Sequence, residues 1–530
     1  MESTSALAPE HRLWMSAQLQ EVSRDFKAAA QTYTSLLGLA PDNIDYGLRL
    51  AEAQTLGGAS KDALQTIETL RALPAPLSLD PRIDLAAARA LQRLGDAKRQ
   101  LALALSAGQG AARRNARLIQ ADAKLLESAA QDALGDRTAS GRAAEEAQRL
   151  FEAAGDRTGS ARSLERVAVG LYRGGDLESS RKLFERALEL HTEIGDNLGM
   201  ARVKLNVANA VYRQGDRALA TRLEGEALAT FKSVGARAEE ASALNNIASR
   251  MHRSGDLAGA QGKYNEALLL FIEIGDRRRT ATLLAHLAEV MAARGDLKDA
   301  QSPLNDSLAT WHELGEQGEV AYVLARLGDL AYARGDLVVA RDRLEEAMRL
   351  QQELKERLTL AETRLSLARV ALAAGKPEEA EVLARDAEEV LRSEKAADAQ
   401  MLASLLIAEA QLAGNRGQEA REAVRKLAQV APKSGSAEVR AAFISLSAHF
   451  QAANGDVAGA LSSLDLARRN AAKDKLVDIE FRLRLAAGQL EMRSGQQKAG
   501  RRRLLELAPA AEAAGFVLIA RLAREAAEGS

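Results

Sequence analysis

The sequence LNVANAVYRQGD, residues 205–216, ends in a Gly-Asp pair that belongs to a series running through the chain. Aspartate follows the glycines of this series in all but two cases, Ala236 and Glu316. The glycines lie twenty residues apart, at Gly135, Gly155, Gly175, Gly195, Gly215, Gly235, Gly255, Gly275, Gly295, Gly315 and Gly335. Glycine takes the left-handed conformation after a helix end without a Cβ clash. Aspartate caps the next helix by accepting from its free backbone N–H groups. The pattern predicts a row of nearly equal helices joined by very short turns.

Small residues show that the true repeat is forty residues long. One series lies seven residues before alternate turns, at Ala168, Ala208, Ala248, Ala288, Gly328, Ala368, Ala408, Ala448 and Gly488. A second follows the turns, at Ser180, Ala220, Ala260, Ala300, Ala340, Ala380, Ala420, Ala460 and Gly500. Small side chains at fixed points let two helices approach closely, and a larger one there would overpack the contact by roughly 1–3 kcal/mol. Apolar residues fill the rest of each stripe at helical spacing, so the unit is a pair of packed helices.

Helix pairs with small residues at these places resemble the tetratricopeptide repeat (TPR). The strings LNVANAVYRQGD and YNEALLLFIEIGD (264–276) are similar to the longer units of kinesin light chains, spindle-polarity adaptors and bacterial regulators, rather than to the common unit of about 34 residues. The resemblance covers nearly the whole chain. It implies an all-α protein, an α-solenoid in which TPR-like helix pairs form a right-handed superhelix.

Two stretches near the start resemble a narrower group. LAPDNIDYGLRLAEAQ (39–54) and PRIDLAAARA (81–90) are similar to the TPR region that follows a kinase or winged-helix domain in some bacterial regulators. The sequence shows neither a glycine-rich phosphate loop after a strand nor His-Arg-Asp or Asp-Phe-Gly. The resemblance therefore implies that this chain is the sensing or docking part alone.

The expected organisation has four parts. Residues 1–73 hold short TPR-like repeats after a frayed end at 1–9, and the proline-rich residues 74–81 form a joint. Residues 82–434 form the core of the superhelix, and 435–530 hold further repeats with a polar capping helix at about 516–527. In all we expect thirteen helix pairs and that final helix. Three irregularities are predicted: Gly108-Gln109-Gly110 ends a helix, and the register slips at Lys355-Glu356 and near Pro432–Ser436.

Composition and motifs exclude several functions. The 72 basic and 73 acidic residues leave a net charge of −1, which gives no overall attraction to nucleic acid or to an anionic membrane. The chain contains no cysteine and no apolar run long enough to span a bilayer, and we expect it to be cytoplasmic. None of the six histidines is paired at the spacing that presents two zinc ligands on one helix, and no catalytic set is recognisable. We expect no metal, no cofactor and no enzyme activity.

Function is expected in the concave groove, which the first helix of each pair lines in the TPR family. Positions two before and one after the first series of small residues, together with those one turn away, face this groove. The expected peptide-binding residues are Arg166, Arg202, Asn206, Asn209, Arg213, Asn246, Arg253, His286 and Arg326. Asparagine can bond a peptide backbone donor and acceptor together, and arginine grips carboxylates with two hydrogen bonds.

The sequence thus predicts a non-catalytic protein–protein interaction scaffold that holds an acidic or C-terminal segment of a partner over residues 160–330. Two alternatives stay open. The polar groove residues could merely solvate an unused face, or the chain could be the sensor or regulatory module of a bacterial signalling or transcription-control system. The sequence does not indicate the oligomeric state.

Overall fold

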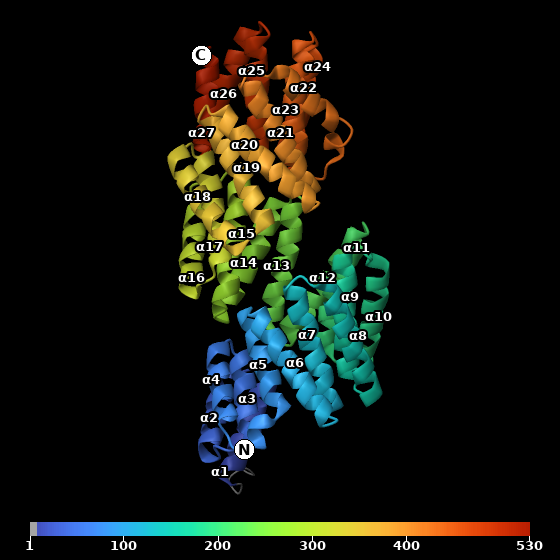
Figure 1. The fold of residues 1–530 in the computed structure, drawn as a ribbon. Helices are drawn as coiled ribbons and strands as arrows, with labels where there is room; N and C mark the ends of the chain where they lie inside the picture. Colours follow the sequence, from blue (N-terminus) through green and yellow to red (C-terminus); the bar gives the residue numbers. More distant parts are fainter. Residues whose placement is uncertain (1–7, 530) are drawn as a thin grey trace. The chain divides into compact units, whose positions relative to one another are not determined.

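The computed structural model describes residues 8–529, apart from the side chain of Arg253. These residues form 27 α-helices and no strand (Figure 1). Most of the frayed end predicted for residues 1–9 lies outside the described residues, and Pro9 already begins α1. The helices are α1 (Pro9–Val22), α2 (Phe26–Leu39), α3 (Ile44–Leu56), α4 (Ser60–Arg71), α5 (Pro81–Leu94), α6 (Ala97–Arg113), α7 (Arg117–Ala133), α8 (Arg137–Ala154), α9 (Arg157–Gly174), α10 (Leu177–Glu193), α11 (Asn197–Arg213), α12 (Arg217–Ser233), α13 (Arg237–Arg253), α14 (Leu257–Glu273), α15 (Arg277–Arg294), α16 (Gln301–Leu314), α17 (Gln317–Ala333), α18 (Leu337–Leu354), α19 (Arg357–Ala373), α20 (Pro377–Ser393), α21 (Ala397–Ala413), α22 (Gly417–Leu427), α23 (Ala437–Ala453), α24 (Val457–Lys473), α25 (Val477–Arg493), α26 (Gln497–Ala513) and α27 (Val517–Glu528).

The helices form an all-α solenoid of consecutive pairs, as predicted. Helices α1 to α26 make thirteen pairs, and α27 follows as the single last helix. From α7 onward each first helix begins forty residues after the preceding one. Short 3-10 turns at Leu77–Leu79 and Ala431–Lys433 occupy the two places where proline interrupts the pattern.

The Gly-Asp joints have the predicted geometry. All eleven glycines of the series have positive φ, between 65° at Gly235 and 99° at Gly215. At eight of the nine Gly-Asp joints of the series the aspartate caps the next helix; Asp216, for example, accepts from the backbone N–H of Leu219 at 3.0 Å. At these joints a helix ends and the next one begins within about three residues. The exception is Asp296, after which a longer turn precedes α16, whose N-cap Ala300 has no side-chain hydrogen bond.

The helix end predicted at Gly108-Gln109-Gly110 is wrong. Helix α6 runs through these residues to Arg113. A Cβ on Gly110 would lie 3.2 Å from Cβ of Pro81, and one on Gly108 would lie 3.6 Å from Cβ of Ala123. The glycines thus give a close approach between neighbouring helices rather than a chain reversal. Packing of this kind offsets the weak helix propensity of glycine.

The two predicted register slips are also wrong. Lys355 has a φ of 59°, so it takes the left-handed conformation that glycine has at the other joints. Helix α19 therefore begins forty residues after α17, as the repeat requires. Near Pro432 the loop is longer because α22 is shorter and ends at Leu427 (Gly417–Leu427). Helix α23 still begins forty residues after α21.

The small residues lie at the helix contacts, as predicted. Ala168, Ala208 and Ala368 are fully buried. A Cβ on Gly328 would come within 2.6 Å of Cγ of Leu344, and a Cβ on Gly488 would come equally close to Cγ of Leu504. At these two points the paired helices approach so closely that no side chain fits.

The chain divides into two compact units, residues 1–243 and 244–530. In each unit the first helix of a pair contacts the first helix of the next pair, as α5 does with α7 and α17 with α19. First helices therefore line the more tightly curved side of each unit, which we call its inner face. The four-part division drawn from the sequence stays a prediction.

The second unit closes on itself. Gly295, at the end of α15, lies against Val477 of α25, and Gly335, at the end of α17, lies against Leu518 of α27. One hydrophobic core contains residues from α15 to α19 together with residues from α25 to α27. In Figure 1, α27 accordingly lies beside α17.

Candidate functional site

Arginine dominates the inner face of the first unit. Helices α5, α7, α9 and α11 repeat a pattern in which the positions six and two before, and one and five after, the first-series small residue face inward. Nine of these positions hold a charged residue. Eight of the nine are arginines, and the other is Asp122. We call this set the arginine face: Arg82, Arg89, Arg93, Arg162, Arg166, Arg173, Arg202 and Arg213. A chain with a net charge of −1 thus concentrates positive charge on one side of one unit.

Two aspartates of α7 neutralise part of this charge. Asp122 lies 3.0 Å from Nη2 of Arg89 and 3.4 Å from Nη1 of Arg162. Asp132 lies 3.0 Å from Nη2 of Arg166 and also pairs with Arg173. Arg82 pairs separately with Asp45 and Asp80. Each carboxylate of α7 is shared by two guanidinium groups, and eight arginines still outnumber these four aspartates, so the face keeps an excess of positive charge.

The charge of Asp132 is stabilised by this sharing. Burial acts to raise the pKa of its carboxyl group, but the hydrogen bond and the positive charge of Arg173, together with Arg166, lower that pKa below its ordinary value. Burial also lowers the pKa of Arg166, against the opposing effect of Asp132. Both groups remain charged at neutral pH.

A hollow of about 350 Å³ lies in the middle of the arginine face. Its walls come from α5, α7, α9 and α11. Seven charged or polar residues and three apolar ones line it: Arg89, Gln92, Asp122, Leu125, Leu126, Ala129, Arg162, Glu165, Arg166 and Arg202. Four of these residues are arginines, so an anionic group is the complementary ligand.

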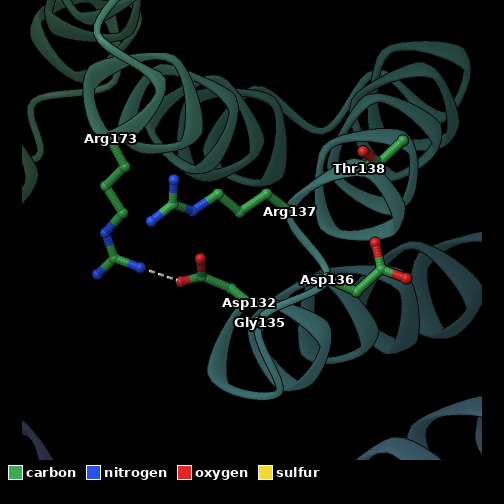
Figure 2. Close-up of a pocket in the computed structure, with 6 residues that line it drawn as sticks. All are labelled: Asp132, Gly135, Asp136, Arg137, Thr138 and Arg173. Carbon is green, nitrogen blue, oxygen red and sulfur yellow. Dashed lines mark hydrogen bonds and ion pairs between the residues drawn. The ribbon is translucent and has the colours of Figure 1, made fainter. Parts of the chain in front are cut away.

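A second hollow, of about 550 Å³, opens at the turn between α7 and α8. Figure 2 shows Arg137 and Arg173 extending toward Asp132 from different helices, whereas the carboxylate of Asp136 points away from them. Asp136 caps α8 through the backbone N–H of Ala139. This hollow extends the arginine face toward one edge of the first unit.

The structure separates the predicted site residues of the first unit into two groups. Arg166 and Arg213 reach back to the preceding repeat: Arg166 donates to the carbonyl oxygen of Ser128 at 3.0 Å, and Arg213 donates to that of Tyr172 at 3.1 Å. In the described part of the chain Arg202, Asn206 and Asn209 have no hydrogen-bond or ion-pair partner. All three are half-buried on the same face of α11, and Arg202 lines the central hollow.

The remaining predicted residues belong to the second unit. Asn246 is exposed, and the side chain of Arg253 lies outside the described residues. His286 packs against Tyr264 with ring centroids 5.7 Å apart, and burial lowers the pKa of its imidazole. Arg326 pairs with Asp329 at 3.4 Å and reaches Glu289 at 4.0 Å. These four residues belong to the second unit and are not counted in the arginine face, which is defined by helices of the first unit.

Sequence reasoning missed the early part of the face. Arg82, Arg89 and Arg93 lie on α5, before the stretch in which the groove was expected. Extending the forty-residue series of small residues backward from Ala168 through Ser128 to Ala88 would have revealed them. The pairing role of Asp122 and Asp132 depends on side-chain geometry and has no such signal.

The repeats match known families. The profile of the "MalT-like TPR region" covers residues 201–519, and that of the "tetratricopeptide repeat" covers residues 159–233. The chain belongs to the family of MalT-like TPR regions. A comparison with curated proteins gave no match.

Solved structures of other TPR-like proteins resemble this member in fold. A Rap protein complexed with competence and sporulation factor is 14% identical, with 71% of this chain and 99% of that one covered at a TM-score of 0.45. Yeast Tom70 is 15% identical, with coverage of 90% and 92% and a TM-score of 0.41. The apo quorum sensor NprR from B. thuringiensis is 13% identical, with coverage of 66% and 99% and a TM-score of 0.44. At these identities the likeness concerns fold alone.

Among the described residues no group of His, Asp or Glu is arranged to hold a metal ion. In the same part of the chain no helix is long and apolar enough to cross a membrane.

Proposed function

We propose that this TPR protein is a non-catalytic interaction module that binds an acidic segment of a partner protein on the arginine face of its first unit. The observation that carries the proposal is the surplus of arginine around the central hollow, where four arginines meet two acids, Asp122 and Glu165. Asp122 is shared by Arg89 and Arg162, and Arg202 pairs with no acid among the described residues. A cytoplasmic location belongs to the same proposal and rests on the sequence.

Some arginines around the hollow are fixed by ion pairs, whereas Arg202 is available to a ligand. Arg89, Arg162 and Arg166 are held in place by aspartates, which pre-organises their remaining N–H donors toward the hollow. Arg202 has all of its donors available, and one turn further along α11 lies Asn206. An extended peptide could therefore place a carboxylate against Arg202 and a backbone amide against Asn206.

The proposal is tested with peptides of matched length and different charge. Fluorescence polarisation would compare a labelled oligoglutamate with a labelled oligoglutamine on the intact protein. We expect the oligoglutamate to bind more tightly, and its affinity to fall as salt screens the arginines. Equal affinity for the two peptides, or binding that ignores salt, would contradict the proposal.

The family match favours a second candidate, in which the same module is the sensor of a bacterial signalling or transcription-control system. In that case occupation of the arginine face would change the affinity for a further regulatory protein. Affinity capture from a native extract, with and without saturating oligoglutamate, separates the two. A captured protein that the peptide displaces is a direct ligand of the face, whereas one whose capture requires the peptide indicates a sensor.

A further inference from the structure

The arginine and the acid that meet at the central hollow are both replaced one repeat later. Asp122 of α7, Arg162 of α9 and Arg202 of α11 hold the same position in consecutive repeats, forty residues apart. Arg89 of α5 and Ala129 of α7 likewise hold one position in consecutive repeats. The step from α5 to α7 thus carries arginine and aspartate, whereas the step from α7 to α9 carries alanine and arginine at those positions.

Asp122 shows how the earlier step is neutralised. Its carboxylate lies 3.0 Å from Nη2 of Arg89 and 3.4 Å from Nη1 of Arg162, so it serves the arginine that lies forty residues further on. The repeat relation pairs Arg202 in the same way with the position of Arg162, which is an arginine already paired with Asp122. In the described part of the chain Arg202 has no hydrogen-bond or ion-pair partner. Arg202 therefore lacks the acid that the repeat relation gives to Arg162.

Space for an acidic side chain lies beside Arg202. Arg202 is half-buried and lines the central hollow of about 350 Å³. Ala129 also lines it, and its side chain ends at Cβ where the preceding repeat has the long side chain of Arg89. Glu165, the second acid of the hollow, lies 2.8 Å from Nε2 of His191 and forms no ion pair with an arginine among the described residues. The hollow therefore leaves Arg202 for an acid that comes from another molecule.

We propose that one acidic side chain of the ligand takes, between Ala129 and Arg202, the place that Asp122 takes between Arg89 and Arg162; this rests on the function proposed above. The ligand carboxylate pairs with Arg202 through charge-assisted hydrogen bonds, and the stem of its side chain packs over Ala129. Asp122 is then an internal counterpart of the ligand. Arg202 and Ala129 determine where on the arginine face the acidic segment is held.

The substitution Ala129→Leu tests the space without changing any charge. It fills the place beside Arg202, and Arg89 shows that a long side chain is accommodated at the equivalent position. We expect fluorescence polarisation to show that the affinity for labelled oligoglutamate falls about tenfold, the equivalent of one lost charge-assisted contact. The matched control is Ala133→Leu, at the exposed end of the same helix and outside the hollow, which should bind as the wild type does. Unchanged binding by Ala129→Leu, or an equal loss in both variants, would overturn the proposal.

A second variant supplies the acid from the chain itself. Arg162→Asp puts a carboxylate forty residues before Arg202, and we expect the two to pair as Asp122 pairs with Arg162. The affinity for labelled oligoglutamate should then fall about tenfold, as it should for Arg202→Ala. The double variant should bind no more weakly than either single one, because both changes remove the same contact. Losses that add to about a hundredfold would overturn the proposal, since Arg162→Asp would then act only by repelling the ligand.

Stability without ligand reports the same pairing. Arg162→Asp should unfold at a higher urea concentration than Arg162→Ala, and this difference should disappear when Arg202→Ala is added to both. A difference that survives Arg202→Ala would overturn the proposal, as would the absence of any difference. Failure of the wild type to bind oligoglutamate would overturn the proposed function and this inference with it. Wild-type binding that Ala129→Leu leaves intact would overturn the inference alone.

Discussion

Arg369 of α19 and Glu438 of α23 form an ion pair of 2.6 Å across 69 residues of sequence. Arg482 of α25 lies 3.8 Å from the same carboxylate, so Glu438 links three first helices on the inner face of the second unit. The positive charge of Arg369 lowers the pKa of Glu438 below its ordinary value. Because the second unit closes on itself, charges from distant repeats meet here.

Removing this link should destabilise the second unit. Glu438→Ala leaves Arg369 without its acid and Arg482 with Asp478 alone, and we expect a loss of about 1–3 kcal/mol in the free energy of unfolding. The matched control is Glu422→Ala, which removes an exposed pair with Lys426 and should cost less than about 1 kcal/mol. Urea denaturation would measure both. Equal losses would show that Glu438 contributes no more than a surface charge.

The effect of Glu438 should also depend on pH. Since its pKa is lowered in the folded protein, its contribution is fully present above the ordinary pKa of a glutamate and disappears as the pH falls through the folded value. The wild type and Glu438→Ala should therefore differ in stability at neutral pH and converge in acid. Denaturation curves at a series of pH values would show a constant difference if the account is wrong.

Glu409 of α21 should behave in the opposite way. Burial raises the pKa of this carboxyl group, and the nearby Arg369 and Arg482 only partly offset the effect. A raised pKa means that the charged form is disfavoured in the folded protein, so the residue lowers stability above its folded pKa and is neutral below its unfolded one. We expect Glu409→Gln to raise the melting temperature at pH 7 and to leave it unchanged in acid. A lower melting temperature at pH 7 would contradict this.

The closest helix contacts can be tested with alanine. Gly328→Ala would place a Cβ 2.6 Å from Cγ of Leu344, and we expect it to destabilise the protein by roughly 1–3 kcal/mol despite the better helix propensity of alanine. Gly225, in the middle of α12, has nothing within 4 Å of the new atom. Gly225→Ala should stabilise the protein by about 0.5–1 kcal/mol. Chemical denaturation of the two variants should give changes of opposite sign.

How far the sequence predicts the fold depends on the range of each signal. The Gly-Asp joints act within a few residues, which explains why the thirteen pairs and the last helix could be predicted. Lys355 shows the limit of that rule, because a lysine in the left-handed conformation ends α18 as glycine does elsewhere. The closure of the second unit, in which Gly335 meets Leu518, results from small rotations summed over many repeats, and no local motif encodes that sum.

The candidate site follows the same division. Helical spacing correctly grouped Arg202 with Asn206 on one face of α11, because the positions on a helix surface are fixed by its period. The spacing could not show that Asp132 forms an ion pair with Arg166, since this contact joins side chains of different repeats. The spacing likewise gave no signal for the contacts of His191 with Glu165 and Asp196, which appear only in the three-dimensional structure.

The most direct test of the proposed function is the affinity of labelled oligoglutamate for Arg202→Ala. Arg202 has no partner within the described residues, so its removal should leave stability unchanged while the affinity falls about tenfold, the value of one charge-assisted contact. The control is Arg186→Ala on α10. Arg186 is exposed, pairs only with Glu189 three residues further along its own helix, and does not belong to the arginine face. A fall in affinity confined to Arg202→Ala is the predicted result. Unchanged binding by Arg202→Ala, or an equal loss in both variants, would show that the arginine face is not the binding site.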